Sequence, residues 1–434
     1  MRSSSGVSIL TPPDAPGRQL FTNCAQVVTC AGPPRARRGP ELSELLIERD
    51  CSVLVEGGAI VQVGSRAVLE RIAGVTAIDC EGGVLLPGLV DSHSHAIFGK
   101  PRFEEQELRA QGLDYMEIAR RGGGIHSSVR DLRQRGEEEL YELAMRRLLR
   151  IASHGTTTLE VKSGYGLTID DEMKMLRVIA RLSRSLPLRL VPTFLGAHEI
   201  PLEARATTSG RSDYVALLVK EMIPQVASLG LARFVDVFCE PGVFTIEETR
   251  TILSCARREG LLLKLHADEL RPSGGAELAA SLGATSADHL AAISESGVRA
   301  LAEADTVATL LPGTMLFLGK DRQAPARALI EAGAAVALAT DFNPGTSPTV
   351  NFPLILTLAV SQLRMSVSEA VLAATVNGAA ALALADRVGQ IAPGFSADFA
   401  LFDIADVREL PYWYGDRRCR ATWVRGVPCH VESR

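Results

Sequence analysis

Two histidines separated by one serine follow a short apolar run in the first quarter of the chain. His93 and His95 end the run GLVDSHSH. If this run is a strand, its two-residue period places both imidazoles on one face, within reach of one metal ion. A hydrogen-bonded polar pair explains the spacing equally well when the two residues are taken alone. The pair is therefore a candidate metal site whose other ligands must come from elsewhere in the chain.

Two further candidate ligands end other apolar runs. His266 stands at the end of LLLKLHADE, and Asp341 follows VALAT, where an unpaired carboxylate would be costly. Three imidazole nitrogens and one carboxylate oxygen suit Zn²⁺ or Fe²⁺ better than Mg²⁺ or Ca²⁺. A structural zinc site more often contains cysteine, and no cysteine is adjacent to these residues. We expect His93, His95, His266 and Asp341 to bind one catalytic divalent ion.

Catalysis also requires groups that move protons, because a metal ion activates water and polarises a carbonyl but cannot shuttle protons to a leaving nitrogen. Glu269 stands three residues after His266, from where its carboxylate can reach a group bound at the ion. His289, in the run ATSADHL, is placed to orient water or stabilise an oxyanion, or else to support Asp341. We predict catalytic roles for Glu269, His289 and Asp341.

These residues share one kind of position, because they lie at or near the C-terminal ends of apolar runs. Eight such runs alternate with stretches of helical period, namely GLVDSHSH, TTTLEVKS, LRLVPTFLG, RFVDVFCE, LLLKLHADE, ATSADHL, TVATLLPG and AAVALATDFNP. Apolar strands that alternate with helices indicate an α/β protein with a parallel sheet buried on both faces. Eight units predict a (β/α)8 TIM-like barrel, whose strand ends meet at one mouth. A doubly wound open sheet is the alternative.

The two ends of the chain have a different pattern of apolar and polar residues. Residues 19–87 and 385–434 contain short runs with apolar and polar alternation, broken by glycines, which are typical of antiparallel strands. We expect these segments to form one small composite β-sandwich, and residues 88–384 to form the barrel. Residues 1–18 contain several prolines and no apolar segment of signal-peptide length, so we expect a disordered N-terminus.

Composition excludes several classes of protein. The 46 basic and 51 acidic residues give a net charge of −5, and no basic block is present to follow a phosphate backbone, which argues against a nucleic-acid partner. No apolar window reaches the length of about 18 residues that a membrane span requires. The eight cysteines are scattered without a C-x-x-C pair, which favours reduced thiols and a cytoplasmic location.

Residues in the loops after the predicted strands are candidates for binding a small-molecule substrate. Arg102, seven residues after His95, can clamp a carboxylate, and a net negative protein needs such a local cation for an anionic ligand. Tyr165 lies in the loop SGYG. Asn343, Gly345 and Thr346 follow Asp341 in DFNPGTSP, where exposed amides could bind polar ligand atoms or simply form a turn.

The ordered motifs resemble those of the metal-dependent amidohydrolase superfamily: VDSHSH after LLPG, then HADE, SADH and ATDFNPG. Within it, the chain is most similar to the imidazolonepropionases, the ring-opening hydrolases of histidine degradation. That similarity lies in EVKSGYGL, TFLGAHEIP, VDVFCE, KLHADEL, GATSADHL, LLPGT and ATDFNPGTSP, and it extends from Gly82 to the C-terminal β segment. The resemblance implies a barrel with a composite β-sandwich, and a homodimer.

The resemblance also implies residue roles. The implied metal ligands are His93, His95, His266 and Asp341, with Glu269 and His289 as the acid-base and polarising pair. The implied substrate contacts are Arg102, Tyr165, His198, Glu269, Asn343, Gly345 and Thr346. The implied reaction is hydrolysis of the cyclic amide of 4-imidazolone-5-propanoate to N-formimidoyl-L-glutamate, with either Asp341 or Glu269 as the general base.

The chain departs from the family pattern at two places. Ser94 replaces the usual threonine between the paired histidines, and Lys100-Pro101 replaces the usual glycine-acidic pair before Arg102. Relatives with two metals have a carboxylated lysine that ends the fourth strand, whereas RFVDVFCE has none and Lys162 lies on the second. One ion, Zn²⁺ or Fe, is therefore favoured.

Two other functions are open at this point. A mononuclear deaminase of a heterocycle would share the metal ligands and the glutamate three residues after His266, but it would release ammonia. A catalytically inactive scaffold on the same fold should lack one or more ligands, whereas this chain has the complete set.

Overall fold

The computed structural model describes residues 17–113, 117–118 and 121–432, so the predicted N-terminus lies almost entirely outside the described residues. All eight predicted strands are present and form one sheet in which each strand is parallel to the next along the chain. They are β8 (Leu89–Asp91), β9 (Thr156–Lys162), β10 (Arg189–Ala197), β11 (Phe234–Cys239), β12 (Leu262–Ala267), β13 (Ser286–His289), β14 (Val307–Leu310) and β15 (Val336–Leu338). The predicted barrel is confirmed.

The first and last strands meet beyond their own ends. Ser94 and Phe342 form a parallel bridge. The backbone N–H of Asp341 donates to the carbonyl of His93 at 3.1 Å, and the N–H of His95 donates to the carbonyl of Phe342 at 2.8 Å. These bonds exclude the open-sheet alternative. They also fix the backbone at three of the four predicted metal ligands.

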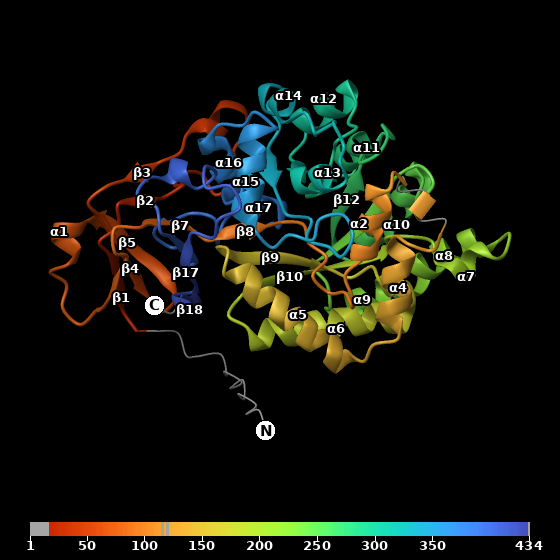
Figure 1. Ribbon diagram of the computed structural model, residues 1–434, viewed down its shortest axis with the longest axis horizontal. Helices are drawn as coiled ribbons and strands as arrows, with labels where there is room; N and C mark the ends of the chain where they lie inside the picture. The colour runs from red at the N-terminus through yellow and green to blue at the C-terminus, as the bar shows by residue number, and fades with distance from the viewer. Residues whose placement is uncertain (1–16, 114–116, 119–120, 433–434) are drawn as a thin grey trace.

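Helices surround the strands and complete the βα units (Figure 1). In Glu137–Ala152, three glutamates occupy the first turn and Arg150 the last, as the helix dipole favours, and Leu140, Ala144, Leu148 and Ile151 form one buried stripe. The helices are α1 (Arg66–Leu69), α2 (Phe103–Ala110), α4 (Ile125–Arg133), α5 (Glu137–Ala152), α6 (Ile169–Ser185), α7 (Leu202–Arg205), α8 (Gly210–Leu217), α9 (Ile223–Ser228), α10 (Ile246–Arg258), α11 (Gly275–Ser281), α12 (Glu295–Glu303), α13 (Pro312–Phe317), α14 (Ala326–Glu331), α15 (Phe352–Ser361), α16 (Val367–Ala373) and α17 (Val376–Ala381).

The segment DYVALLVKEMIPQVASL has a helical period, but it does not form one regular α-helix. A π-helical turn at Leu218–Met222 separates α8 from α9. Pro224 in the first turn of α9 has no N–H to donate to the carbonyl four residues earlier, so the helix widens just before it.

Strands from both ends of the chain form two further sheets beside the barrel (Figure 1). One sheet has the order β5-β4-β1-β6 and the other β18-β17-β16-β7-β2-β3. Their bounds are β1 (Gln19–Thr22), β2 (Gln26–Val28), β3 (Ile47–Glu48), β4 (Cys51–Glu56), β5 (Ala59–Ser65), β6 (Thr76–Asp79), β7 (Val84–Pro87), β16 (Phe399–Phe402), β17 (Cys419–Val424) and β18 (Val427–Val431). The antiparallel pairing of β7 with β16 joins the two ends of the chain.

The expectation of antiparallel strands is wrong for two pairs, because β1 is parallel to β6 and β2 is parallel to β7. Between β1 and β6 the chain forms β2 to β5 and α1, which gives it the length to return and run in the same direction as β1.

The core between these two sheets contains aromatic side chains from both ends of the chain. The Phe21 ring lies 4.8 Å from that of Phe399 and 5.1 Å from that of Trp423, both edge to face. All three are buried. Such pairs contribute stability beyond the area that they bury.

We expect Phe399→Ala to destabilise the sandwich by about 3–5 kcal/mol, because the removed ring leaves a cavity against Phe21. Urea unfolding followed by tryptophan fluorescence, to which Trp423 in this core contributes, measures the change. Tyr412→Ala, at a side chain that is 73% exposed, is the control and should change stability by no more than about 0.5 kcal/mol. A loss below 1 kcal/mol in Phe399→Ala would contradict this description of the core.

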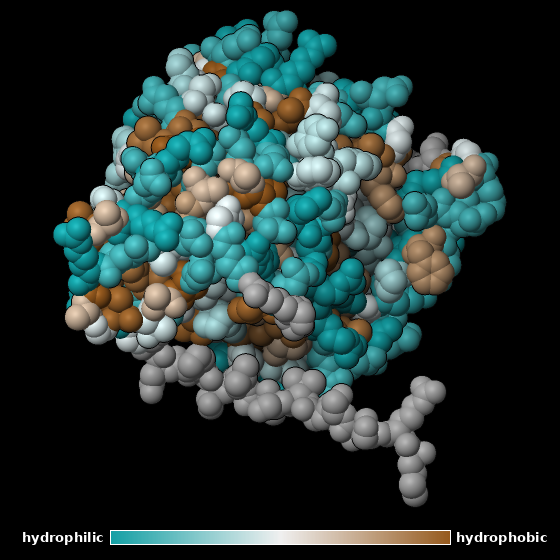
Figure 2. Space-filling model, turned by 60° about the vertical axis from the view of Figure 1, so that its left-hand side comes forward, coloured by the Kyte–Doolittle hydropathy of each residue, from teal (hydrophilic) through white to brown (hydrophobic). Residues whose placement is uncertain are grey.

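The surface that Figure 2 turns to the viewer is largely hydrophilic, with apolar residues in small separate patches. Within the described part of the chain, no helix combines the length and apolarity needed to cross a membrane. All eight cysteines are free thiols, and six of them are buried.

Candidate active site

The predicted metal ligands lie at the C-terminal ends of the barrel strands. His93 and His95 follow β8, His266 is the second-to-last residue of β12, and Asp341 follows β15. All four side chains are buried. Asp341 has a φ of 52°, in the left-handed region that non-glycine residues rarely adopt. Backbone strain of this kind is concentrated at functional sites.

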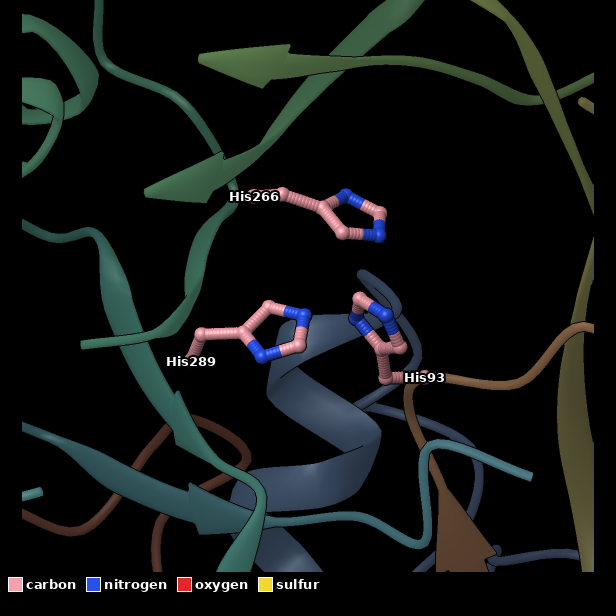
Figure 3. A group of neighbouring side chains, drawn as sticks. All are labelled: His93, His266 and His289. Atoms are coloured by element: carbon pink, nitrogen blue, oxygen red, sulfur yellow. The ribbon is translucent and has the colours of Figure 1, made fainter. Parts of the chain in front are cut away.

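The histidine rings converge on one small volume. The ring of His93 lies 4.5 Å from that of His266 and 5.2 Å from that of His289, and the last two are 5.1 Å apart. Figure 3 shows the three side chains reaching toward one another from separate segments of the barrel. His289, the last residue of β13, has a φ of 79°. The structure thus brings the predicted polarising residue next to two predicted ligands.

The carboxylate of Asp341 faces the paired histidines. Its Oδ1 lies 3.6 Å from Nε2 of His93 and 3.6 Å from Nε2 of His95. Its Oδ2 accepts a 2.6 Å hydrogen bond from the hydroxyl of Thr314 on α13. Burial raises the pKa of this carboxyl to about 6, although the Thr314 bond opposes the change. Only one carboxylate oxygen is thereby left to face the rings.

The donor atoms fit a metal ion. Buried ring nitrogens of His93, His95, His266 and His289 have no hydrogen-bond partner. Burial holds the pKa of His93, His95 and His289 well below the usual value, so that these rings keep a lone pair. Neutral imidazoles with a carboxylate suit Zn²⁺ or Fe.

Three overlapping sets of these side chains place their ligand atoms within 4.8 Å of one another. They are His93 with His266 and His289, His95 with His198 and His266, and His93 with His95 and Asp341. No single set contains all four predicted ligands, but each pair of predicted ligands except His266 and Asp341 shares a set. The site is therefore a compact cluster around the two histidines that follow β8.

Glu269 lies beside this cluster. Its Oε2 is 3.7 Å from Nδ1 of His289. Burial raises the pKa of Glu269 well above its usual value, and the nearby carboxylates of Asp341 and Glu240 add to the effect. A glutamic acid that holds its proton in a buried site is a suitable proton donor to a leaving nitrogen.

The loop that carries Glu269 is held by Glu240, the residue after β11. The carboxylate of Glu240 accepts from the backbone N–H groups of Glu269 at 3.1 Å, Leu270 at 3.3 Å and Arg271 at 2.9 Å. These three hydrogen bonds fix the backbone at Glu269, and therefore the position from which its side chain extends.

The predicted substrate contacts fall into two groups around the cluster. The ring of His198 stacks on that of His95 at 5.1 Å and lies 5.3 Å from that of Tyr165, while its Nδ1 hydrogen-bonds to the carbonyl of Gly164 at 2.9 Å. The second group contains Arg102 and the loop after Asp341.

Arg102 is buried against that loop. Its Nη1 donates to Ser128 at 3.3 Å, its Nε lies 3.4 Å from the Glu105 carboxylate, and its backbone N–H donates to the carbonyl of Pro344 at 2.9 Å. Glu105 also accepts from the N–H of Gly124 at 2.7 Å. The guanidinium is thus held between Ser128 of α4 and Glu105 of α2.

The side chain of Asn343 hydrogen-bonds within its own loop. Its Oδ1 accepts from the N–H groups of Gly345 at 2.9 Å and Thr346 at 2.7 Å, and its Nδ2 donates to the Thr346 hydroxyl at 2.8 Å. The amide therefore stabilises the turn that sequence analysis kept as the alternative to ligand binding.

Known proteins are similar to this chain over most of its length. Residues 84–429 match the amidohydrolase family. An imidazolonepropionase of Solibacter usitatus is 46% identical over 93% of this chain and 96% of its own length, and one of a Geobacillus species is 47% identical over 92% and 95%. The chain belongs to the imidazolonepropionase family of amidohydrolases. Among solved structures, a zinc-bound adenosine deaminase from Xanthomonas campestris matches with a TM-score of 0.70 at 19% identity, over 96% of this chain and 94% of its own, which shows the shared fold.

A group of charged residues beneath the histidines was not predicted from the sequence: Glu160, Asp236, Lys264 and Asp288, which join Lys162. A signal was present, because Glu160 stands two residues before Lys162 and Lys264 two residues before His266. Residues two apart on a strand share a face.

Proposed function

We propose that the chain hydrolyses the cyclic amide of 4-imidazolone-5-propanoate to N-formimidoyl-L-glutamate, with one Zn²⁺ or Fe ion bound by His93, His95, His266 and Asp341. The observation that carries the proposal is the cluster of buried imidazoles with unpartnered ring nitrogens beside the Asp341 carboxylate. Membership of the imidazolonepropionase family supplies the substrate class.

The reaction adds water across a C–N bond. The water oxygen bonds to the carbonyl carbon, the ring C–N bond breaks, and the nitrogen gains a proton. An ion in this site would supply Lewis-acid polarisation of the carbonyl and would make water more acidic. Glu269 passes a proton to the ring nitrogen as the bond breaks, and either Asp341 or Glu269 takes the proton of the attacking water.

His289 stabilises the developing oxyanion. Its ring is buried between His266 and the Glu269 carboxylate, and its Nε2 has no hydrogen-bond partner. A polar group that is already fixed in a buried site loses little free energy in reorganising when charge develops.

Arg102 anchors the propanoate. Ser128 and Glu105 fix the guanidinium at the edge of the site, and a fixed guanidinium suits a carboxylate better than a mobile lysine. Tyr165 and His198 lie beside His95, where their rings can contact the imidazolone ring, while Asn343 and Thr346 shape the loop next to Arg102.

Gly345→Ala tests the Arg102 clamp without changing its charge. An added Cβ would lie 1.6 Å from Nη2 of Arg102, so the guanidinium must move. We expect KM to rise about 10-fold to 100-fold, the cost of losing a hydrogen bond to a charged group, with metal content unchanged. Steady-state kinetics measure this. Gly136→Ala is the control, because nothing lies within 4 Å of its added Cβ. An unchanged KM in Gly345→Ala would contradict the anchoring role.

Product analysis tests the reaction itself. The protein is incubated with freshly prepared 4-imidazolone-5-propanoate, the loss of ultraviolet absorption is followed, and products are identified by mass spectrometry and an ammonia assay. The proposal predicts N-formimidoyl-L-glutamate without ammonia. Direct ammonia release from a heterocyclic substrate, with no ring-opened product, would instead support a deaminase.

The cellular location and the oligomeric state are part of the same proposal. The eight free cysteines support a reducing, cytoplasmic location, and the family resemblance supports a homodimer. Sedimentation equilibrium of the purified protein tests the second, since a mass of 46.4 kDa would indicate a monomer instead.

A further inference from the structure

Five charged side chains lie inside the barrel, and none of them has measurable exposure. Lys162 Nζ lies 2.6 Å from Asp236 and 2.8 Å from Glu160. Lys264 Nζ lies 3.0 Å from Glu160 and 3.5 Å from Asp288. The residues of this buried charge cluster lie on β9, β11, β12 and β13. The strand between β9 and β11, β10, contributes the hydroxyl of Thr193, which donates to Glu160.

Burying a cluster of this kind lowers the stability of the fold. Buried ion pairs often stabilise a fold less than apolar residues of the same volume would, because each charge loses its hydration. Three carboxylates and two ammonium groups leave one net negative charge directly beneath the predicted cation site. This arrangement is unfavourable for a bare barrel core and favourable next to a divalent ion, which points to a role in the site.

The cluster contacts the predicted ligands directly. Asp288 accepts a 2.6 Å hydrogen bond from Nδ1 of His93. With the proton on Nδ1, the lone pair of His93 is on Nε2, the atom that has no partner and lies 3.6 Å from Asp341. Asp236 accepts from the backbone N–H of His266 at 3.1 Å, and its other oxygen lies 2.9 Å from Nδ1 of that ring.

We propose that Asp288 is a positioning residue that fixes the tautomer and orientation of His93 for metal binding, and that Lys162, Lys264 and Ser286 hold its carboxylate in place. Ser286 donates to Oδ1 of Asp288 at 2.6 Å, which leaves Oδ2 for His93. Carboxylates that accept from the second nitrogen of a ligating histidine commonly tune metal affinity. The inference rests on the metal site of the proposed function, but not on its substrate.

A second cation does not explain the cluster. His93, Glu160 and Asp288 are close enough to hold an ion by themselves. The ammonium groups of Lys162 and Lys264 already lie within 3.9 Å of Asp288 and within 3.0 Å of Glu160. The positive charge that these carboxylates need is therefore supplied by the chain.

Metal affinity in Asp288→Asn tests the inference. Zn²⁺ is titrated into the metal-free full chain in competition with a chromophoric chelator, and the Co²⁺-loaded protein is examined by visible absorption. We expect Zn²⁺ to bind about 10-fold to 100-fold more weakly, the Co²⁺ bands to shift, and kcat to fall while KM changes little. Asp398→Asn is the matched control: it removes a buried carboxylate just before β16 of the sandwich, which accepts from Arg425 N–H, Ser396 and Arg189. It should leave the Zn²⁺ affinity unchanged.

A milder variant covers the case in which Asp288→Asn does not fold. Ser286→Ala removes only the donor to Oδ1 of Asp288 and should weaken Zn²⁺ binding about fivefold, the effect of one hydrogen bond. If Asp288→Asn folds and its Zn²⁺ affinity is within twofold of that of the unmodified chain, the inference is overturned. If Asp288→Asn does not fold, the same result in Ser286→Ala overturns it. Weaker Zn²⁺ binding in a protein that does not open the imidazolone ring would instead reject the proposed substrate and support the positioning role.

Discussion

Replacing His266 by alanine is expected to remove the metal and to lower kcat/KM by at least about 10³-fold, because the site then loses the several kcal/mol of transition-state stabilisation that a bound ion supplies. His266 is the residue to change because its ring lies within 6 Å of those of His93, His95 and His289. Metal per chain is measured by atomic emission after gel filtration, and turnover is measured on the same sample.

His430→Ala is the matched control for that substitution. His430 lies on β18 in the sandwich and contacts Arg417, so this variant should keep its metal and its activity. If His266→Ala retained as much metal and activity as the unmodified chain, the cluster would not be a catalytic metal centre, and the buried imidazoles would need another explanation.

Glu269→Gln is expected to lower kcat by about 10²-fold to 10⁴-fold, the usual contribution of a positioned general acid or base. The amide has nearly the shape of the carboxyl group but carries no transferable proton, and the Glu240 contacts to the backbone are unaffected. Metal content should remain that of the unmodified chain. This result would separate proton transfer from metal binding.

The control for Glu269→Gln is Glu259→Gln, a neutralised glutamate that is exposed at the end of α10. It should have no effect on kcat. A kcat of Glu269→Gln within threefold of the unmodified value would rule out Glu269 as the proton carrier.

The barrel could be predicted from the sequence because its signal is local. Each of the eight apolar runs coincides with one observed strand to within a few residues, and the candidate metal ligands and catalytic residues lie at or just after the strand ends. In a parallel barrel those ends must meet, so His93, His95, His266 and Asp341 could be placed together without any knowledge of side-chain geometry.

The buried charge cluster could not be predicted in the same way, because it depends on register between strands. Asp236 pairs with Lys264 across β11 and β12, and His266 pairs with Asp288 across β12 and β13. From the sequence alone, a lysine or aspartate in the middle of a strand is most simply interpreted as a solvent-exposed side chain. Only the pairing of the strands shows that these carboxylates and ammonium groups lie side by side.

One error had a cause that acts over a longer distance. The parallel pairing of β1 with β6 depends on the path of the chain through β2 to β5 and α1, which strand periodicity does not contain. The π-helical turn before α9 follows from Pro224, a local signal that was present in the segment. The roles of the individual site residues remain proposals that the variants above test.

Metal reconstitution tests the central claim most directly. The full chain is stripped with a chelator, and turnover of 4-imidazolone-5-propanoate is measured as Zn²⁺ or Fe²⁺ is added back in steps. The four-ligand site predicts no turnover in the metal-free protein and full recovery at one equivalent per chain. Turnover that persists in the metal-free protein, or that recovers only at two equivalents, would contradict it.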